Sequence, residues 1–413
     1  MRDTEAEKHQ PSRSRKHSCV PFESEAHYQE GVADVAKYRA YLTTLHPQHP
    51  ELFSQALGEG DTCHDRDQSR KQQGVVRRIK LKATQRVFTL RPSFVLPYLS
   101  ARTEAVEKAL FWRQWGVPFT ALAYVFGRDA RFWYRAGLSF GRPTLVGTTV
   151  TPQAQRPQDV VADEKVTWLD GEEVVVPTTV GGNGVLGISV APEATTASGK
   201  AADGACVTEA QAVFADYQVR SACTDGFRAT RPAWRQLFPP RTRVLCFLPA
   251  ILKLTERCRG ALRCQVLDRA WHVYQAATKG QFSPRLRRLA EWAQTTLDGS
   301  VAAMVGKMAH HRADFTPAYD CHHAARTTKA VDRLHNHWDR VLYAMRSCQG
   351  QRATARWAVR AWALQGNFPP SGPRLRHDQP ARSSPFADLN GFHYHPNWLH
   401  NFLIASSMGG LRL

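Results

Sequence analysis

The stretch Val160-Val161-Ala162-Asp163-Glu164-Lys165 is followed directly by Val166-Thr167-Trp168-Leu169-Asp170-Gly171-Glu172-Glu173-Val174-Val175-Val176. Both parts are rich in β-branched residues, which favour strands. The pair Asp170-Gly171 between them predicts a hairpin, because glycine tolerates the positive φ angle of a tight turn. The sequence therefore predicts two antiparallel strands, the first of which carries an acidic residue, Asp163.

Further strands are expected downstream of this hairpin. A glycine-rich turn at residues 181–184 leads into the apolar run Val185–Val190, which completes a three-stranded meander. A fourth expected strand ends at Asp225, and a fifth, buried one follows at residues 243–248, each after a helical segment. This order is typical of an α/β protein with a mixed sheet. Because reacting groups collect at strand ends in such sheets, Asp163 and Asp225 are candidate functional residues.

The composition bounds the class of protein. The 413 residues suffice for two or three domains, and 55 Lys and Arg against 36 Asp and Glu give a formal net charge of +19. Such an excess predicts an anionic polymer as partner, with a generally soluble basic protein as the alternative. Nine irregularly spaced cysteines favour a reducing cytoplasm, and the longest apolar run, Val244–Leu252, is too short to predict a membrane segment.

The N-terminal third is expected to contact DNA. Residues 1–25 are polar and predict a disordered basic arm, and residues 26–147 predict a DNA-binding region with a basic hairpin at residues 75–95. Three short helices between residues 103 and 135 resemble a helix-turn-helix, although a small bundle packed on the core would have the same pattern. The residues expected to contact DNA are Arg78, Lys80, Lys82, Arg128, Arg131 and Arg135.

The remaining chain, residues 158–413, is expected to form one catalytic domain. Helical spacing of apolar residues predicts a helical insertion at about residues 253–314. A later helix should present the apolar stripe Val331, Leu334 and Trp338 to the sheet.

The order of the expected elements and several short motifs resemble those of a known family. The expected order of elements is similar to the ribonuclease H-like core of DDE transposases. Over roughly residues 90–410 the chain resembles bacterial insertion-sequence transposases related to the Mutator-like group. Four short motifs carry this resemblance: Asp163-Glu164-Lys165, Thr224-Asp225-Gly226, Arg326-Thr327-Thr328 and Leu389-Asn390-Gly391-Phe392. The resemblance implies a prokaryotic, cytoplasmic enzyme, associated with the nucleoid when bound, that acts as a homo-oligomer on element ends and target DNA.

The same resemblance implies the ligands of a metal site. Asp163, Asp225 and a third acid would hold Mg²⁺, with Mn²⁺ as an alternative. The segment Arg326–Asp332 resembles the signature Arg-Thr-Thr-Asn-x-x-Glu around that acid, with Lys in place of Asn and Asp332 in place of Glu. Asp314 and Asp339 are the competing candidates, and Asp339 is expected to pair instead with Arg340 or Arg333.

One cysteine and the reaction itself leave alternatives open. Related transposases tend to place Cys and His three residues apart on the fifth strand, but Pro249 follows Cys246 here, so Cys246 is expected to be a small core residue. The predicted function is DNA strand cleavage and strand transfer. The alternatives are a nuclease of the same fold without strand transfer, and a transposase-derived DNA-binding protein without catalysis.

Overall fold

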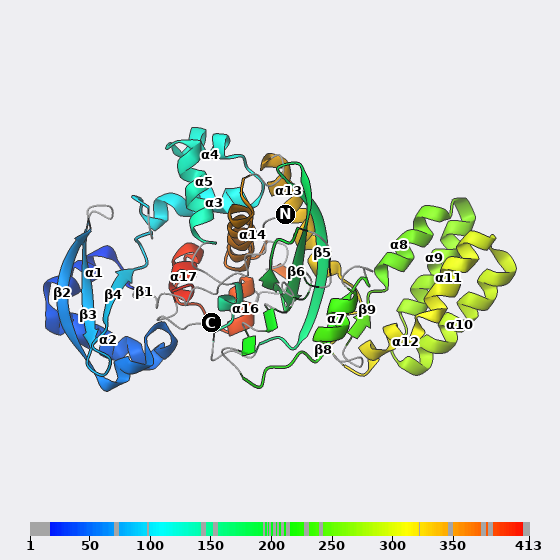
Figure 1. The fold of residues 1–413 in the computed structure, drawn as a ribbon, viewed down its shortest axis with the longest axis horizontal. Helices are drawn as coiled ribbons and strands as arrows, with labels where there is room; N and C mark the ends of the chain where they lie inside the picture. The colour runs from blue at the N-terminus through cyan, green and yellow to red at the C-terminus, as the bar shows by residue number, and fades with distance from the viewer. Residues whose placement is uncertain are drawn as a thin grey trace, which may run out of the picture. The chain divides into compact units, whose positions relative to one another are not determined.

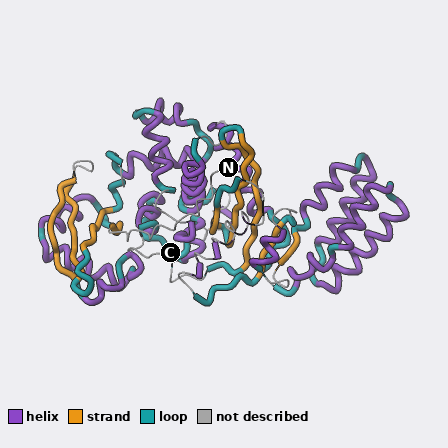
Figure 2. Tube along the Cα trace, in the orientation of Figure 1, coloured by secondary structure: helices purple, strands orange, loops and turns teal. Residues whose placement is uncertain are grey.

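The computed structural model shows a mixed α/β protein with two mixed sheets and many helices (Figures 1 and 2). No helix among the described residues is long and apolar enough to cross a membrane. The structure describes residues 17–69, 74–96, 99–141, 146–151, 156–192, 195, 197, 200, 204, 206, 207, 210, 211, 215–226, 231–238, 243–321, 323–345, 350–372, 377, 378 and 383–407.

Packing divides the chain into two compact units. The first comprises Met1–Gln155 with Arg360–Leu413, and the second comprises Arg156–Val359. This division differs from the expected domain boundaries, because the C-terminal residues group with the N-terminal region and not with the segment that carries Asp163 and Asp225.

The first unit contains a four-stranded sheet in the order β1-β4-β3-β2. The expected basic hairpin is present as β3 (Gly74–Leu81) and β4 (Val87–Pro92), which pair antiparallel. Two strands were not expected: β2 (Asp61–Ser69), whose sequence is polar, and β1 (His17–Val20), which pairs parallel with β4. β1 lies within the expected basic arm, and residues 1–16 of that arm lie outside the described residues.

Helices of the first unit include the three short ones expected from the sequence. The bounds are α1 Glu25–Ala33, α2 Val35–Gln48, α3 Thr103–Gln114, α4 Phe119–Phe126, α5 Ala130–Ser139, α16 Pro385–Asn390 and α17 Trp398–Ala405, with short 3₁₀ turns η1 Pro50–Leu52, η2 Gln55–Glu59 and η3 Val146–Thr149. Asp129 caps α5, since its Oδ1 accepts a 2.6 Å hydrogen bond from the Phe132 amide.

A five-stranded sheet organises the second unit. Its strands are β5 Asp159–Leu169, β6 Glu172–Gly181, β7 Gly184–Ile188, β8 Ser221–Thr224 and β9 Arg243–Leu245, in the order β7-β6-β5-β8-β9. The predicted meander is confirmed, since β6 is antiparallel to both β5 and β7. Asp170 and Gly171 have φ angles of 49° and 87°, the left-handed geometry of the predicted turn. β8 is parallel to β5 and to β9.

Helices follow the last strands of this sheet. They are α7 Arg231–Leu237, α8 Leu248–Arg257, α9 Gly260–Tyr274, α10 Lys279–Thr296, α11 Gly299–His310, α12 Arg312–Phe315, the 3₁₀ turn η5 Thr316–Tyr319, α13 Lys329–Met345 and α14 Arg352–Asn367. Helices are thus present throughout the predicted insertion, and α8 to α11 form a bundle around fully buried residues such as Leu254, Val266 and Val305 (Figure 1). The helix expected from residue 206 to 214 lies partly outside the described residues.

Candidate metal centre

Two acids leave the sheet of the second unit side by side. β5 and β8 run parallel, and their last registered pair is Val161 with Cys223. Asp163 and Asp225 each stand two residues beyond that pair, so strand alternation places their side chains on the same face. One carboxylate oxygen each from Asp163, Glu164 and Asp225 lie within 4.8 Å of one another.

Gly226 determines how the chain leaves β8 after Asp225. Its φ angle of +77° is one that L side chains rarely adopt, and a Cβ atom there would stand 2.5 Å from Cδ1 of Leu245. The chain can therefore turn away immediately after Asp225, which leaves this carboxylate at the strand end.

The helix α13 brings the third predicted acid to the same place. It packs on β5 and β6, and two of its side chains fix this position. His335 Nε2 lies 3.2 Å from Thr178 Oγ1 on β6, and Asp339 Oδ1 lies 2.7 Å from Lys165 Nζ on β5. Asp332 shares a helix face with His335 and Asp339, because residues three and four apart are neighbours on a helix. Asp332 and Asp163 lie close enough that each affects the other's pKa.

Burial and like charge dominate the electrostatics of this cluster. Burial, followed by the charge of Asp225, raises the pKa of Asp163 to about 8, although the Glu164 amide donates a 2.9 Å hydrogen bond to its Oδ1. Burial also raises the pKa of Asp332, against the effect of the Thr328 hydroxyl, which donates to Asp332 Oδ2 at 3.4 Å. A divalent cation would neutralise half-buried carboxylates that lie beside one another, so the residues fit such an ion.

Two buried cysteines, Cys223 and Cys246, lie near Thr328, the residue that donates a hydrogen bond to Asp332. Cys246 follows β9 and contacts Cys223 of β8 and Thr328 before α13. The Thr328 amide donates a 3.2 Å hydrogen bond to Cys246 Sγ. Hydrogen bonds from Cys223, and then from Thr328, lower the pKa of Cys246 to about 7, whereas that of Cys223 is raised well above its usual value. Cys246 is buried, as expected, and through Thr328 it also positions Asp332.

Glu164 is a candidate ligand that the sequence did not indicate. Alternation along a strand would place it on the face opposite Asp163. Pairing of β5 with β8 ends at Val161, however, so Glu164 lies beyond the paired part of that edge, and its longer side chain reaches the other two acids. Its only signal in the sequence was its position next to Asp163.

The competing acids have other partners. Asp339 forms its ion pair with Lys165 and not with the expected Arg340 or Arg333. Asp314 lies 2.8 Å from His311 Nδ1 and 3.4 Å from Arg231 Nη2. Both carboxylates therefore form ion pairs within the protein.

The predicted DNA contacts of the first unit differ in their surroundings. Arg78 forms a two-bond ion pair with Asp65 on β2, and Lys80 is half-buried on β3, whereas Lys82 is exposed. The other three belong to or precede α5: Arg128 lies over the Phe132 ring at 5.2 Å, and Arg131 and Arg135 are exposed one turn apart. These two arginines share one helix face, as a contact with DNA phosphates would require.

Comparison with known proteins adds no assignment: the chain matches no protein-family profile and no curated protein sequence. The chemistry of the site is therefore argued from its own residues. Carboxylate oxygens are the ligands that Mg²⁺ and Mn²⁺ prefer, and the described residues of the second unit bring such oxygens together from β5 and from the residue after β8, with Asp332 of α13 near Asp163.

Proposed function

We propose that the chain is a DDE-type transposase, a metal-dependent enzyme that cleaves DNA at element ends and joins it to target DNA. One observation carries the proposal: Asp163 and Asp225 come from two strands and, with Glu164, bring carboxylate oxygens within 4.8 Å of one another, while α13 places Asp332 beside Asp163. Burial and the charge of Asp225 raise the pKa of Asp163, and a carboxylate perturbed in this way beside other acids favours a functional site such as a metal centre.

The topology supports the proposal. The order β7-β6-β5-β8-β9, with an antiparallel meander followed by two parallel strands, is the one expected of a ribonuclease H-like core. The first acid lies on the first strand of that sheet and the second follows the fourth strand. A helix that packs on the sheet then supplies the third acid.

The residues have distinct roles in the proposed reaction. Asp163 and Asp225 would hold Mg²⁺, with Mn²⁺ as the alternative, and Asp332 would complete the site. Divalent ions bound there supply activation of an attacking oxygen and neutralisation of the leaving oxygen in phosphoryl transfer. Asp163, with a pKa of about 8, must release a proton to become a ligand at neutral pH. Thr328 and Cys246 hold Asp332 in place.

The charge of the chain supports DNA as substrate. A formal +19 favours a polyanion, and the exposed Arg131 and Arg135 on α5 offer phosphate contacts in the first unit. In the proposed reaction a homo-oligomer acts on the element ends, with water as nucleophile for nicking and a DNA 3′-hydroxyl for strand transfer.

The test uses purified full-length protein and labelled DNA carrying the ends of the surrounding element. Incubation with Mg²⁺, with Mn²⁺ or with a chelator, followed by mapping of the strands, should give cut and joined products only with metal. Cut strands without joined ones would reduce the assignment to a nuclease. Metal-independent products, or binding without any cleavage, would refute it.

A further inference from the structure

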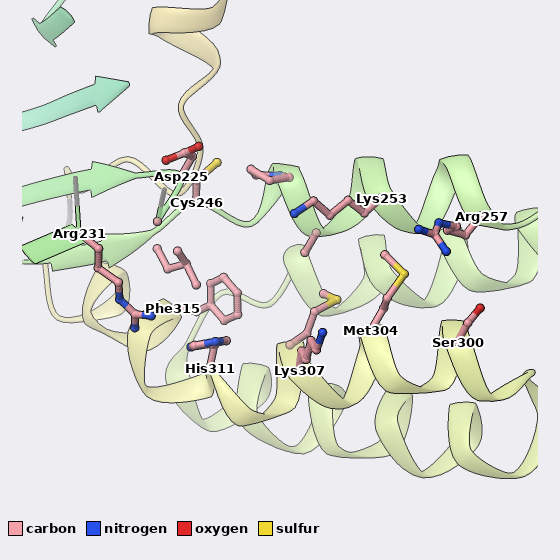
Figure 3. A pocket seen from close by; sticks show the side chains of 15 residues that line it. Asp225, Arg231, Cys246, Lys253, Arg257, Ser300, Met304, Lys307, His311 and Phe315 are labelled. Carbon is pink, nitrogen blue, oxygen red and sulfur yellow. The ribbon is translucent and has the colours of Figure 1, made fainter. Parts of the chain in front are cut away.

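A cavity of about 590 Å³ opens beside Asp225, between α8 and α11 (Figure 3). Asp225 and Cys246 lie at one end of it, and Arg257 and Ser300 lie toward the other. The cavity thus extends from the acidic cluster along the helical bundle. Its volume is in the range of small-ligand sites.

The cavity is lined by cations that lack an acidic partner. Lys253 and Arg257 stand one turn apart on α8, and Lys307 approaches from α11 (Figure 3). Among the described residues, these three form no ion pair, whereas the lining residues Arg231 and His311 both contact Asp314. Among the described lining residues, these three cations outnumber the one carboxylate, Asp225, so the lining is positively charged and favours an anionic ligand.

Apolar side chains also line the cavity. Met304, Met308 and Phe315 line the cavity, and the Phe315 ring is held by edge contacts with Phe247 and Phe282 at 5.2 and 6.1 Å. An anion such as inorganic phosphate would gain nothing from these side chains. A nucleotide matches both the cations and the apolar side chains of the lining. Its phosphate can pair with the lysines, and its base has flat apolar faces that can pack against the apolar side chains.

We propose that the cavity binds an unpaired nucleotide of the DNA strand that continues from the phosphate at the proposed metal site, where Asp225 would be a ligand. The inference rests on the proposed function, since it places that strand at the acidic cluster. Lys253, Arg257 and Lys307 contact the phosphates, and the base lies against Met304 and Phe315. A cavity of this size admits a single strand but not a base pair with both backbones, so the nucleotide must leave the duplex.

The test measures binding without catalysis. Fluorescence anisotropy in EDTA compares a labelled oligothymidylate of about 12 nucleotides with a duplex of the same length over a range of KCl concentrations. The double variant Lys253→Ala/Lys307→Ala should weaken single-strand binding about tenfold, and its salt slope should fall by about 1.4, or about 0.7 for each lost contact. Duplex binding should change less than twofold.

The matched control is Lys279→Ala/Arg288→Ala, which removes the same charge from exposed positions on α10 that do not line the cavity. Equal losses in the two double variants, or a larger loss for duplex than for single strand, would overturn the proposal. If the alanine variant fails to fold, Lys253→Gln/Lys307→Gln keeps the aliphatic stems and tests the same contacts.

The outcomes separate the two proposals. Loss of single-strand binding in the cavity variant, with no metal-dependent cleavage by the wild type, would refute the transposase and leave a single-strand DNA site. Metal-dependent cleavage by the wild type, with unchanged single-strand binding in the cavity variant, would refute the cavity and leave the transposase.

Discussion

Two groups of charged residues, one on each sheet, are arranged in opposite ways. In the four-stranded sheet, Arg78 of β3 pairs with Asp65 of β2, and the buried Arg77 donates to the Val32 carbonyl and lies over the Tyr38 ring. In the five-stranded sheet, Asp163 and Asp225 stand together, and the charge of Asp225 adds to burial in raising the pKa of Asp163. Opposite charges across strands stabilise a fold, whereas gathered like charges cost stability. The second arrangement therefore marks the site where a ligand is expected.

The largest expected effect is on DNA cleavage and comes from removing the charge of Asp163 or Asp225. Asp163→Asn or Asp225→Asn removes a ligand charge with little change of shape, so cleavage should fall by at least about 10³-fold, as with other charge-stabilising groups in phosphoryl transfer. DNA binding in EDTA should stay within about twofold, because phosphate contacts elsewhere dominate affinity.

The matched control for these variants is Asp65→Asn in the other sheet, which removes the same charge from an ion pair and should leave cleavage nearly unchanged. Wild-type cleavage by either site variant, measured on labelled strands, would contradict the assignment.

The next effect concerns stability and pH. Burial lowers the pKa of His335 to about 4, so between pH 4 and about 6.5 the unfolded chain binds the proton that the folded one excludes. The contribution of His335 to the free energy of unfolding is therefore fully present above about pH 6.5. It decreases by about 3 kcal/mol as the pH is lowered from about 6.5 to about 4. The variant His335→Gln should lose this pH dependence of the free energy of unfolding, measured by urea unfolding at several pH values. The Gln side chain can still form a hydrogen bond with Thr178.

His400 of the first unit is the comparison for His335. Burial lowers its pKa too, but Glu104, 2.9 Å from its Nε2, opposes the shift. His400→Gln should therefore flatten the pH dependence less than His335→Gln does. Equal changes in the two slopes would show that Glu104 does not compensate.

A smaller effect distinguishes the acids of α13. Asp332→Ala should reduce cleavage by about 10- to 100-fold, because it removes the ligand that α13 contributes. Asp339→Ala and Asp314→Ala break ion pairs with Lys165 and with Arg231, and should cost only a few-fold. Full activity of Asp332→Ala together with loss of activity in Asp339→Ala would identify Asp339 as the third ligand. The variant Glu164→Gln, assayed in parallel, tests whether the acid next to Asp163 is also a ligand.

The smallest effect lies in the first unit. Arg131→Ala and Arg135→Ala should each weaken end binding a few-fold and reduce the salt slope by about 0.9, since each removes one phosphate contact. Arg78→Ala serves as the control, because its guanidinium is already paired with Asp65. A salt slope that falls in Arg78→Ala but not in the α5 variants would move DNA contact from α5 to the hairpin.

Local signals in the sequence predicted much of the second unit. The Asp170-Gly171 turn fixed the pairing of β5 with β6, and the apolar spacing of Val331 and Trp338 placed one face of α13 on the sheet. These features depend on neighbours in sequence, for which turn chemistry and helical periodicity are reliable.

Other features depend on partners distant in sequence and gave no such signal. β2 is polar along its length and is a strand because it pairs with β3. β1 lies in a basic, polar segment, yet Cys19 and Val20 are fully buried. The partner of Asp339 is Lys165, which no helical spacing could reveal. The end of strand pairing before Glu164 likewise exists only once the sheet has formed.

The docking of α13 by His335 and Lys165 has a consequence for how the protein becomes active. A nascent chain that ends after β8 already contains Asp163 and Asp225, but the helix that carries Asp332 follows the whole bundle α8 to α11. Contacts of such sequence separation form late, because a long loop must first be closed. The proposed site is therefore completed only after the bundle has been synthesised, so a partly folded chain would not cut the DNA from which it is being expressed.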